Sequence, residues 1–197
     1  MNNTNILDND LIWEEVKTEH IIQDEWIDIR RSAYRFPDGT VFEPYYSYSR
    51  RDYTIIVARD EDGKYICVRQ FRHGIKEVTT EFPAGGIERS DGKEYGGPGI
   101  AAEDALEAAK RELMEETGHE SDNWTHLITI PSNATIADNY AYVFMADGCK
   151  KVAGQSLDDT EFLNIVKYDE DEIDELIRTG KFQQIAHVMA YLMAKGR

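Results

Sequence analysis

The stretch Glu103-Asp-Ala-Leu-Glu-Ala-Ala-Lys-Arg-Glu-Leu-Met-Glu-Glu-Thr-Gly118 holds far more carboxylates than a soluble helix needs. Its apolar residues Ala105, Leu106, Ala109 and Leu113 recur at the spacing of one helical face. That spacing predicts an amphipathic helix whose apolar side is buried. A glycine such as Gly118 is the usual residue just past the last turn, so the helix is expected to end there.

Three glutamates of this stretch, Glu112, Glu115 and Glu116, stand at positions i, i+3 and i+4. At that spacing their carboxylates project from one patch of the helix surface. Like charges so placed repel one another by a few tenths of a kcal/mol per pair unless a cation lies among them. Hard divalent cations prefer oxygen ligands, so the pattern predicts a site for Mg²⁺, with Mn²⁺ as an alternative. The competing interpretation is a solvated acidic face.

The wider spacing distinguishes these two interpretations. Gly97 is followed after five residues by Glu103, and after seven more by Arg111-Glu-Leu-Met-Glu-Glu-Thr-Gly118. This arrangement resembles the Nudix box, the signature of the Nudix hydrolases. His119 departs from it, because an aliphatic residue is usual there, and we expect it to affect packing rather than chemistry.

One glycine of the box is ambiguous. In Nudix proteins the segment that resembles Pro83-Ala-Gly-Gly86 normally opens the box six residues before its first glutamate. Here Gly86 precedes Glu103 by 17 positions, which is an excess of 11. We expect Gly86 to fill the structural role, and residues 87–100, rich in glycine and charge, to be an inserted loop.

The rest of the pattern predicts an α/β fold: a Nudix-type α/β/α sandwich with a mixed sheet, preceded by an N-terminal antiparallel β meander. Two domains are expected, a meander over 1–50 for dimerisation and substrate contacts and a Nudix domain over 51–197. In the meander, a turn at Pro37–Gly39 separates two predicted strands. The predicted strands cover 27–36, 41–48, 53–58, 64–71, 124–130, 141–145 and 162–168, the predicted helices 172–178 and 182–195, and a long acidic loop 147–159.

The resemblance also implies roles for the carboxylates. Glu112, Glu115 and Glu116 would bind the metal ions, and Arg111 would orient a carboxylate within the box. Glu103 would belong to the same electrostatic network. A separate glutamate, on a late loop, would act as general base in the branch that hydrolyses ADP-ribose and related nucleoside diphosphate sugars.

The segment that matches this late loop is Leu157-Asp-Asp-Thr-Glu-Phe-Leu-Asn164. Glu161 aligns best with the general base, and Asp159 is the second choice. The alternative is that these acids merely solvate a loop.

Segments outside the box resemble the same ADP-ribose/ADP-sugar pyrophosphatase branch. Val68-Arg-Gln-Phe-Arg72 makes Arg72 a candidate for the diphosphate or the terminal ribose, because a guanidinium binds two phosphate oxygens at once. Glu81, in Glu81-Phe-Pro-Ala-Gly-Gly86, is a candidate for a sugar hydroxyl. Trp26 and Phe42 are candidates for stacking on the base, and ordinary packing is an equal alternative for both.

The resemblance therefore implies hydrolysis of the pyrophosphate bond of a nucleoside diphosphate sugar, ADP-ribose first, to a nucleoside monophosphate and a sugar phosphate. The loop 131–140 departs from that of many ADP-ribose enzymes, so GDP-mannose and ADP-glucose stay open. Two further functions are compatible with the resemblance: a Nudix enzyme that acts on nucleoside triphosphates or dinucleoside polyphosphates, and a non-catalytic sensor of nucleotide sugars.

Composition limits the partners. With 22 basic and 38 acidic residues the net charge is −16, which disfavours nucleic acids and anionic membranes as partners. The sequence shows no signal peptide or apolar run of spanning length, and we expect a cytoplasmic protein. Cys67 and Cys149 are expected to be reduced and buried. A homodimer through the N-terminal strands is implied by the resemblance and is the commonest oligomer.

Overall fold

The computed structural model describes residues 7–89 and 103–196. After a short 3-10 turn (Asp8–Leu11), three antiparallel strands form a separate sheet in the order β1-β2-β3. They are β1 (Glu14–Gln23), β2 (Asp28–Arg35) and β3 (Val41–Ser49). The predicted turn at Pro37–Gly39 and the strands on either side of it are confirmed. Strand β1 was not predicted separately, because almost all of its residues are exposed and it shows no apolar alternation.

The second sheet is mixed and has the order β11-β5-β4-β10-β8. Short strands extend it, since β6 pairs with β5, β7 with β4 and β9 with β10. Strands β4 and β10 run parallel, and the other pairs are antiparallel. The bounds are β4 (Tyr53–Asp60), β5 (Tyr65–Arg72), β6 (Glu77–Glu81), β7 (Ala84–Gly86), β8 (His119–Glu120), β9 (Asn123–Pro131), β10 (Tyr140–Lys151) and β11 (Leu163–Tyr168).

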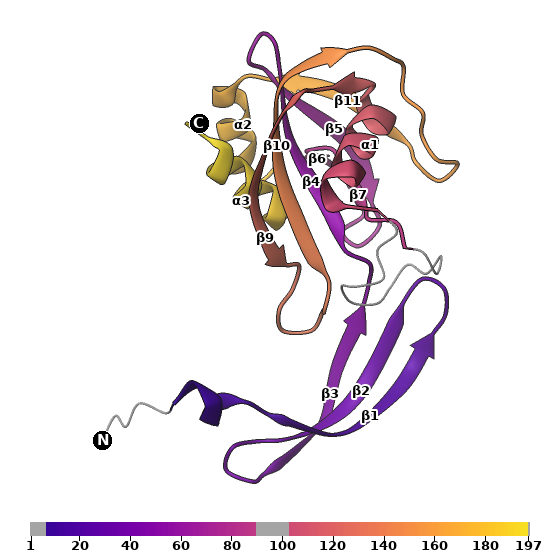
Figure 1. The fold of residues 1–197 in the computed structure, drawn as a ribbon, viewed down its shortest axis with the longest axis vertical. Helices are drawn as coiled ribbons and strands as arrows, with labels where there is room; N and C mark the ends of the chain where they lie inside the picture. Colours follow the sequence, from indigo (N-terminus) through magenta and orange to yellow (C-terminus); the bar gives the residue numbers. More distant parts are fainter. Residues whose placement is uncertain (1–6, 90–102, 197) are drawn as a thin grey trace.

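Helices cover both faces of this sheet (Figure 1). On one side lies α1 (Ala105–Thr117), and on the other lie α2 (Glu170–Arg178) and α3 (Ile185–Ala194). The predicted α/β/α sandwich with a preceding antiparallel sheet is confirmed. None of the described helices is long and apolar enough to cross a membrane.

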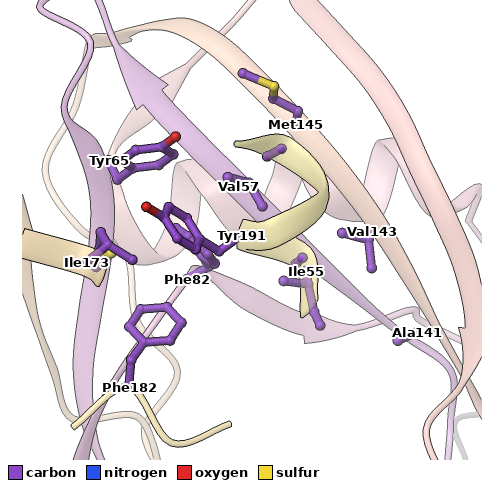
Figure 2. Packing of buried hydrophobic residues seen from close by; sticks show 13 residues of the cluster. Ile55, Val57, Tyr65, Phe82, Ala141, Val143, Met145, Ile173, Phe182 and Tyr191 are labelled. Atoms are coloured by element: carbon purple, nitrogen blue, oxygen red, sulfur yellow. The ribbon is translucent and has the colours of Figure 1, made fainter. Parts of the chain in front are cut away.

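The alternation along β4 separates two cores. Ile55 and Val57 pack toward α2 and α3, where they join Tyr65, Phe82 and Tyr191 (Figure 2). The intervening Ile56 and Ala58 pack toward α1 in the second core. Successive side chains of a strand point to opposite faces, so one apolar run serves both helical layers. Both cysteines are buried and form no disulfide.

The predicted loop over 147–159 is wrong in its first part. Strand β10 continues to Lys151 and pairs there with β8. Gly148 adopts a positive φ of 65°, and the register with β4 shifts between Ala146 and Cys149. The glycine thus forms a bulge within the strand rather than ending it.

The acidic helix has a cap at each end, of which the sequence predicted Gly118 at its C-terminus. The Asp104 side chain accepts a hydrogen bond from the Leu106 backbone at 2.8 Å, which caps the first turn. Gly118 takes the left-handed conformation and donates to the Met114 carbonyl. His119 is buried, and its ring nitrogen Nδ1 lies 2.9 Å from the Thr117 carbonyl oxygen. The expected packing role agrees with this position.

Candidate active site

Arg111 is the centre of a polar network on α1. Its guanidinium donates to both oxygens of Glu103, at 2.7 and 3.3 Å, and to Glu112 and Glu115 at 2.7 and 2.9 Å. It also donates to the Gly86 carbonyl at 3.0 Å. These contacts raise the Arg111 pKa, although burial opposes the shift. Arg111 therefore contacts three carboxylates of the box, and its role in orienting them for catalysis stays a prediction.

The Gly86 contact also bears on the box glycine. Gly86 touches the box network directly, and the Glu88 backbone donates to Glu103 at 2.9 Å. Gly86 and Glu88, at the start of the predicted insertion, therefore both contact the box network. The other glycine, Gly97, and residues 90–102 of the insertion lie outside the described residues.

Glu112 and Glu116 are buried side by side, with exposed fractions of 7% and 2%. Burial raises the pKa of Glu112 to about 7, with repulsion from Glu115 and Glu161 adding to the shift and Arg111 opposing it. Burial and the neighbouring Glu112 hold the pKa of Glu116 well above its ordinary value. A buried pair of acids is costly to ionise unless a cation compensates the charge.

The two glycines of β7 separate this pair from a group of arginines. A Cβ on Gly85 would lie 2.0 Å from the Glu112 carboxyl carbon, so only glycine lets the carboxyl lie against the strand. A Cβ on Gly86 would lie 2.0 Å from Nε of Arg51. Successive residues face opposite sides of a strand. Carboxylates and guanidinium thus approach one thin segment of backbone from its two sides.

A cavity of about 380 Å³ opens on the arginine side of β7. Three arginines line it, and with them two tyrosines and several polar side chains from distant elements. These lining residues are Tyr48, Arg50, Arg51, Tyr53, Arg72, Ser132, Asn139, Gln184 and His187. In a chain of net charge −16, three guanidinium groups at one cavity make a local site for an anion.

Most of these lining residues were missed by the sequence predictions. The adjacent pair Arg50-Arg51, between two strands of an acidic chain, was an available signal. No local sequence pattern identified Gln184 or His187 as site residues, because they come to the cavity from the start of α3, near the far end of the chain.

Arg72 and Glu81 form an ion pair in which the glutamate is buried and the arginine is partly exposed. Nε and an NH2 group of Arg72 donate to the two Glu81 oxygens at 2.8 and 2.5 Å, and Thr79 donates to one of them. Glu81 is completely buried, whereas Arg72 lines the cavity. Arg72 thus stands where an anionic ligand would reach it. The contacts of Glu81 fit a role in holding Arg72, and its contact with a sugar hydroxyl stays a prediction.

Glu161 lies near the buried pair. Its charge contributes to the raised pKa of Glu112 and of Glu116, after burial and nearer groups. Its carboxylate accepts a hydrogen bond from the Asp158 backbone at 3.2 Å, which holds the loop before β11. Asp159 is exposed and contributes to neither shift. The position favours Glu161 over Asp159 as the base.

Trp26 and Phe42 do not meet within one chain. Trp26 lies in the β1–β2 turn and is 58% exposed. Phe42 pairs with Tyr34 at the opposite end of the three-stranded sheet. There it stacks on Phe36, with ring centroids 5.7 Å apart, in a cluster of aromatic rings. Neither residue lines the arginine cavity, and the contacts of Phe42 are those of ordinary packing.

The loop between β9 and β10 is held by β3. The Tyr45 hydroxyl donates to the Thr135 carbonyl at 2.6 Å, and the Tyr48 backbone donates to Ile136 at 2.8 Å. Asp138 accepts from Arg30 at 3.1 Å. The loop 132–139 and the N-terminal sheet therefore share one side of the cavity, where Tyr48, Ser132 and Asn139 lie.

Comparison with known proteins agrees with this geometry. The family model described as NUDIX domain matches residues 49–191. The chain belongs to the Nudix family. The predicted family, its hydrolase activity and its likeness to the ADP-ribose pyrophosphatase branch are confirmed.

Two relatives and one structure support this Nudix assignment. The chain is 25% identical to the methanol dehydrogenase activator of Bacillus methanolicus over 182 residues, which is 89% of this chain and 88% of that protein. It is 27% identical to the ADP-ribose pyrophosphatase of Bacillus subtilis over 143 residues, 71% of each chain. The crystal structure of an ADP compounds hydrolase superposes with a TM-score of 0.77 at 19% identity, over 93% of this chain and 92% of that one.

The Nudix carboxylates suit a divalent ion chemically. Glu112 and Glu116 offer oxygen donors in a buried place where their mutual repulsion needs compensation. Within residues 7–89 and 103–196, no three acidic, histidine or cysteine side chains are grouped as a metal site, and Arg111 bonds two of the three glutamates. The assignment of Glu112, Glu115 and Glu116 as metal ligands stays a prediction.

Proposed function

We propose that this Nudix hydrolase cleaves the pyrophosphate bond of a nucleoside diphosphate sugar, ADP-ribose first, and releases a nucleoside monophosphate and a sugar phosphate. The observation that carries the proposal is the β7 segment, which has the Glu112–Glu116 pair on one side and the arginine cavity on the other. A diphosphate bound by the arginines would lie within reach of ions held by the carboxylates.

Different residues would bind the phosphates, hold the metal ions and accept the proton of the attacking water. Arg72 and Arg51 bind phosphate oxygens from the cavity side. Glu112, Glu115 and Glu116 would hold Mg²⁺, or Mn²⁺ in its place. A bound divalent ion neutralises phosphate charge and lowers the pKa of a bound water. Glu161, from the loop before β11, takes the proton of the attacking water.

We also propose that two copies assemble through the N-terminal strands. None of the described helices lies over this three-stranded sheet in Figure 1, and a sheet needs a packed apolar face for independent stability. Strands β1 to β3 and the turn between β1 and β2 carry exposed large apolar side chains that a partner would cover. They are Val16, Ile21, Ile22, Trp26, Val41, Phe42 and Tyr46.

A second candidate function is activation of an alcohol dehydrogenase. It rests on the likeness to the methanol dehydrogenase activator, which extends over 89% of the chain and so includes at least part of the N-terminal sheet. Adding the purified protein to a methanol dehydrogenase, with and without Mg²⁺, tests it. An unchanged dehydrogenase rate would eliminate this candidate.

The main proposal is tested by incubating the protein and Mg²⁺ with a panel of substrates and identifying the products. The panel holds ADP-ribose, ADP-glucose, GDP-mannose, diadenosine polyphosphates and nucleoside triphosphates. We expect AMP and ribose 5-phosphate from ADP-ribose at the highest kcat/KM. Preferential cleavage of triphosphates or dinucleoside polyphosphates would overturn the substrate assignment, and no hydrolysis at all would overturn the function.

A further inference from the structure

His187, in the first turn of α3, has a fixed ring orientation that the proposed chemistry does not use. Its Nδ1 accepts a hydrogen bond from the Phe82 backbone N–H at 3.1 Å. A nitrogen that accepts cannot carry the proton, so in the neutral ring the proton is on Nε2. The ring is parallel to that of Phe82 within 9°, which keeps the imidazole plane in place.

The Nε2–H group is left without a hydrogen-bond acceptor in the described part of the chain. The nearest carboxylate oxygen, on Glu81, is 4.0 Å away, beyond hydrogen-bond distance, and the Glu81 oxygens already accept from Arg72 and Thr79. His187 is 4% exposed and lines the arginine cavity. Nε2 is not among the fully buried, unpartnered side-chain atoms of the described residues, so it is open to the cavity and its N–H can donate to a ligand atom there.

The ring also stays uncharged. Burial lowers the pKa of His187 to about 4, and Arg72 adds to this effect while Glu81 opposes it. At neutral pH the side chain is therefore a neutral donor. The nearby Glu81 carboxylate disfavours a phosphate at Nε2, whereas a hydroxyl oxygen can accept there without a charge conflict. The arginines of the cavity supply the contacts that phosphates prefer.

We propose that His187 is a specificity-determining residue whose Nε2–H donates to a hydroxyl oxygen of the substrate's sugar in the arginine cavity. This inference rests on the proposed function and assigns the sugar subsite of the same site. Because the proton of the neutral ring is on Nε2, the ligand atom that faces Nε2 must be a hydrogen-bond acceptor.

Two substitutions separate this role from a structural one. In His187→Asn the amide oxygen can replace Nδ1 as acceptor for Phe82, but nothing reaches the position of Nε2. In His187→Gln the amide N–H reaches that position, but the Phe82 bond is lost. If His187 has only a structural role, the Asn variant should be more stable than the Gln variant and should also bind ADP-ribose more tightly. The sugar-donor role predicts the opposite order for binding.

The experiment measures ADP-ribose and ADP binding by calorimetry without metal, hydrolysis of ADP-ribose with Mg²⁺, and the melting temperature. For His187→Asn we expect ADP-ribose affinity to fall and KM to rise about three- to tenfold with kcat within about twofold, the size of one neutral hydrogen bond. ADP, which lacks the second sugar, should bind as to the wild type. His187→Gln should keep ADP-ribose affinity despite a lower melting temperature.

Three results would overturn the inference. They are an ADP-ribose affinity that falls in step with the melting temperature in both variants, an equal fall in ADP affinity, and an unchanged ADP-ribose affinity in His187→Asn. So would a wild type that does not bind ADP-ribose. Failure of the proposed function gives a different result, because the wild type would then hydrolyse no diphosphate sugar. A wild type that hydrolyses ADP-ribose, with an unaffected Asn variant, removes His187 and leaves the function standing.

Discussion

The carboxyl group of Glu112 occupies the space in which a side chain on Gly85 would begin. A Cβ on Gly85 would lie 2.0 Å from the carboxyl carbon and 2.1 and 2.2 Å from its oxygens. The atoms in conflict are the far end of a flexible side chain, so a larger residue at position 85 would displace the carboxylate rather than the strand. The glycine is thus a condition for the position of one proposed metal ligand.

Gly85→Ala should therefore fold and lose activity. We expect the melting temperature to change little, and kcat/KM for ADP-ribose to fall by about tenfold or more, because a catalytic constellation tolerates displacements of only about 0.5 Å. Gly154→Ala is the matched control, since a Cβ there meets nothing within 4 Å. Equal activity of the two variants would contradict the role of Gly85.

Glu161→Gln should lower kcat by about a hundredfold or more while ADP-ribose still binds, because the amide cannot take the proton of the attacking water. Steady-state kinetics and calorimetric binding measure the two effects separately. Asp159→Asn, on the same loop but exposed, should keep near wild-type kcat. The reverse pattern would make Asp159 the base.

Glu116→Gln should weaken Mg²⁺ binding by about tenfold or more, because a carboxylate ligand and its charge are lost together. Calorimetric titration of Mg²⁺ into the protein measures this directly. Glu107→Gln on the same helix is the control, since Glu107 is exposed and, among the described residues, its side chain bonds only Lys110. A Glu116→Gln variant with unchanged Mg²⁺ affinity would remove Glu116 from the ligand set.

His187 should make the protein less stable as the pH falls. Its folded pKa of about 4 is below the ordinary 6.5, so under about pH 6.5 the unfolded chain takes up a proton that the folded chain does not. Between pH 7.5 and 5.5 the wild type should lose about 1 kcal/mol of unfolding free energy relative to His187→Asn. Urea unfolding of both proteins at the two pH values measures the difference, and parallel changes would contradict it.

The double variant Ile21→Asp/Ile22→Asp should dissociate the proposed dimer, because charged groups would then be buried at the interface. Light scattering coupled to size exclusion measures the mass. Val152→Asp, at an exposed apolar position just after β10, should stay dimeric. A wild-type protein that is monomeric at micromolar concentration would overturn the assembly.

The sequence could predict what depends on local spacing. The helix, its C-terminal glycine and the side-by-side position of Glu112 and Glu116 follow from local sequence spacing. The Arg72 region was recognised because its short motif is contiguous. The arginine cavity was not predicted, because Arg51 reaches β7 only through the pairing of β7 with β4.

The same limit explains the other differences. His187 joins Phe82 across 105 residues, and no local pattern marks such a contact. Trp26 and Phe42 look equivalent as exposed aromatics, yet the register of β2 and β3 puts them at opposite ends of a sheet. In β10, Gly148 gave the composition of a loop, but pairing with β4 as far as Cys149 and with β8 at Lys150 and Lys151 keeps the strand continuous.

The hydrogen bonds between β3 and the loop 132–139 limit how far this protein can be shortened from its N-terminus. A truncation at residue 49, where the family match starts, would look like a minimal enzyme. It would discard Tyr45 and Tyr48, which fasten Thr135 and Ile136, and Arg30, which binds Asp138. The fragment would keep every glutamate of the box but lose the residues that support one side of the arginine cavity. The first fifty residues should therefore be kept in any shortened protein that is tested for catalysis.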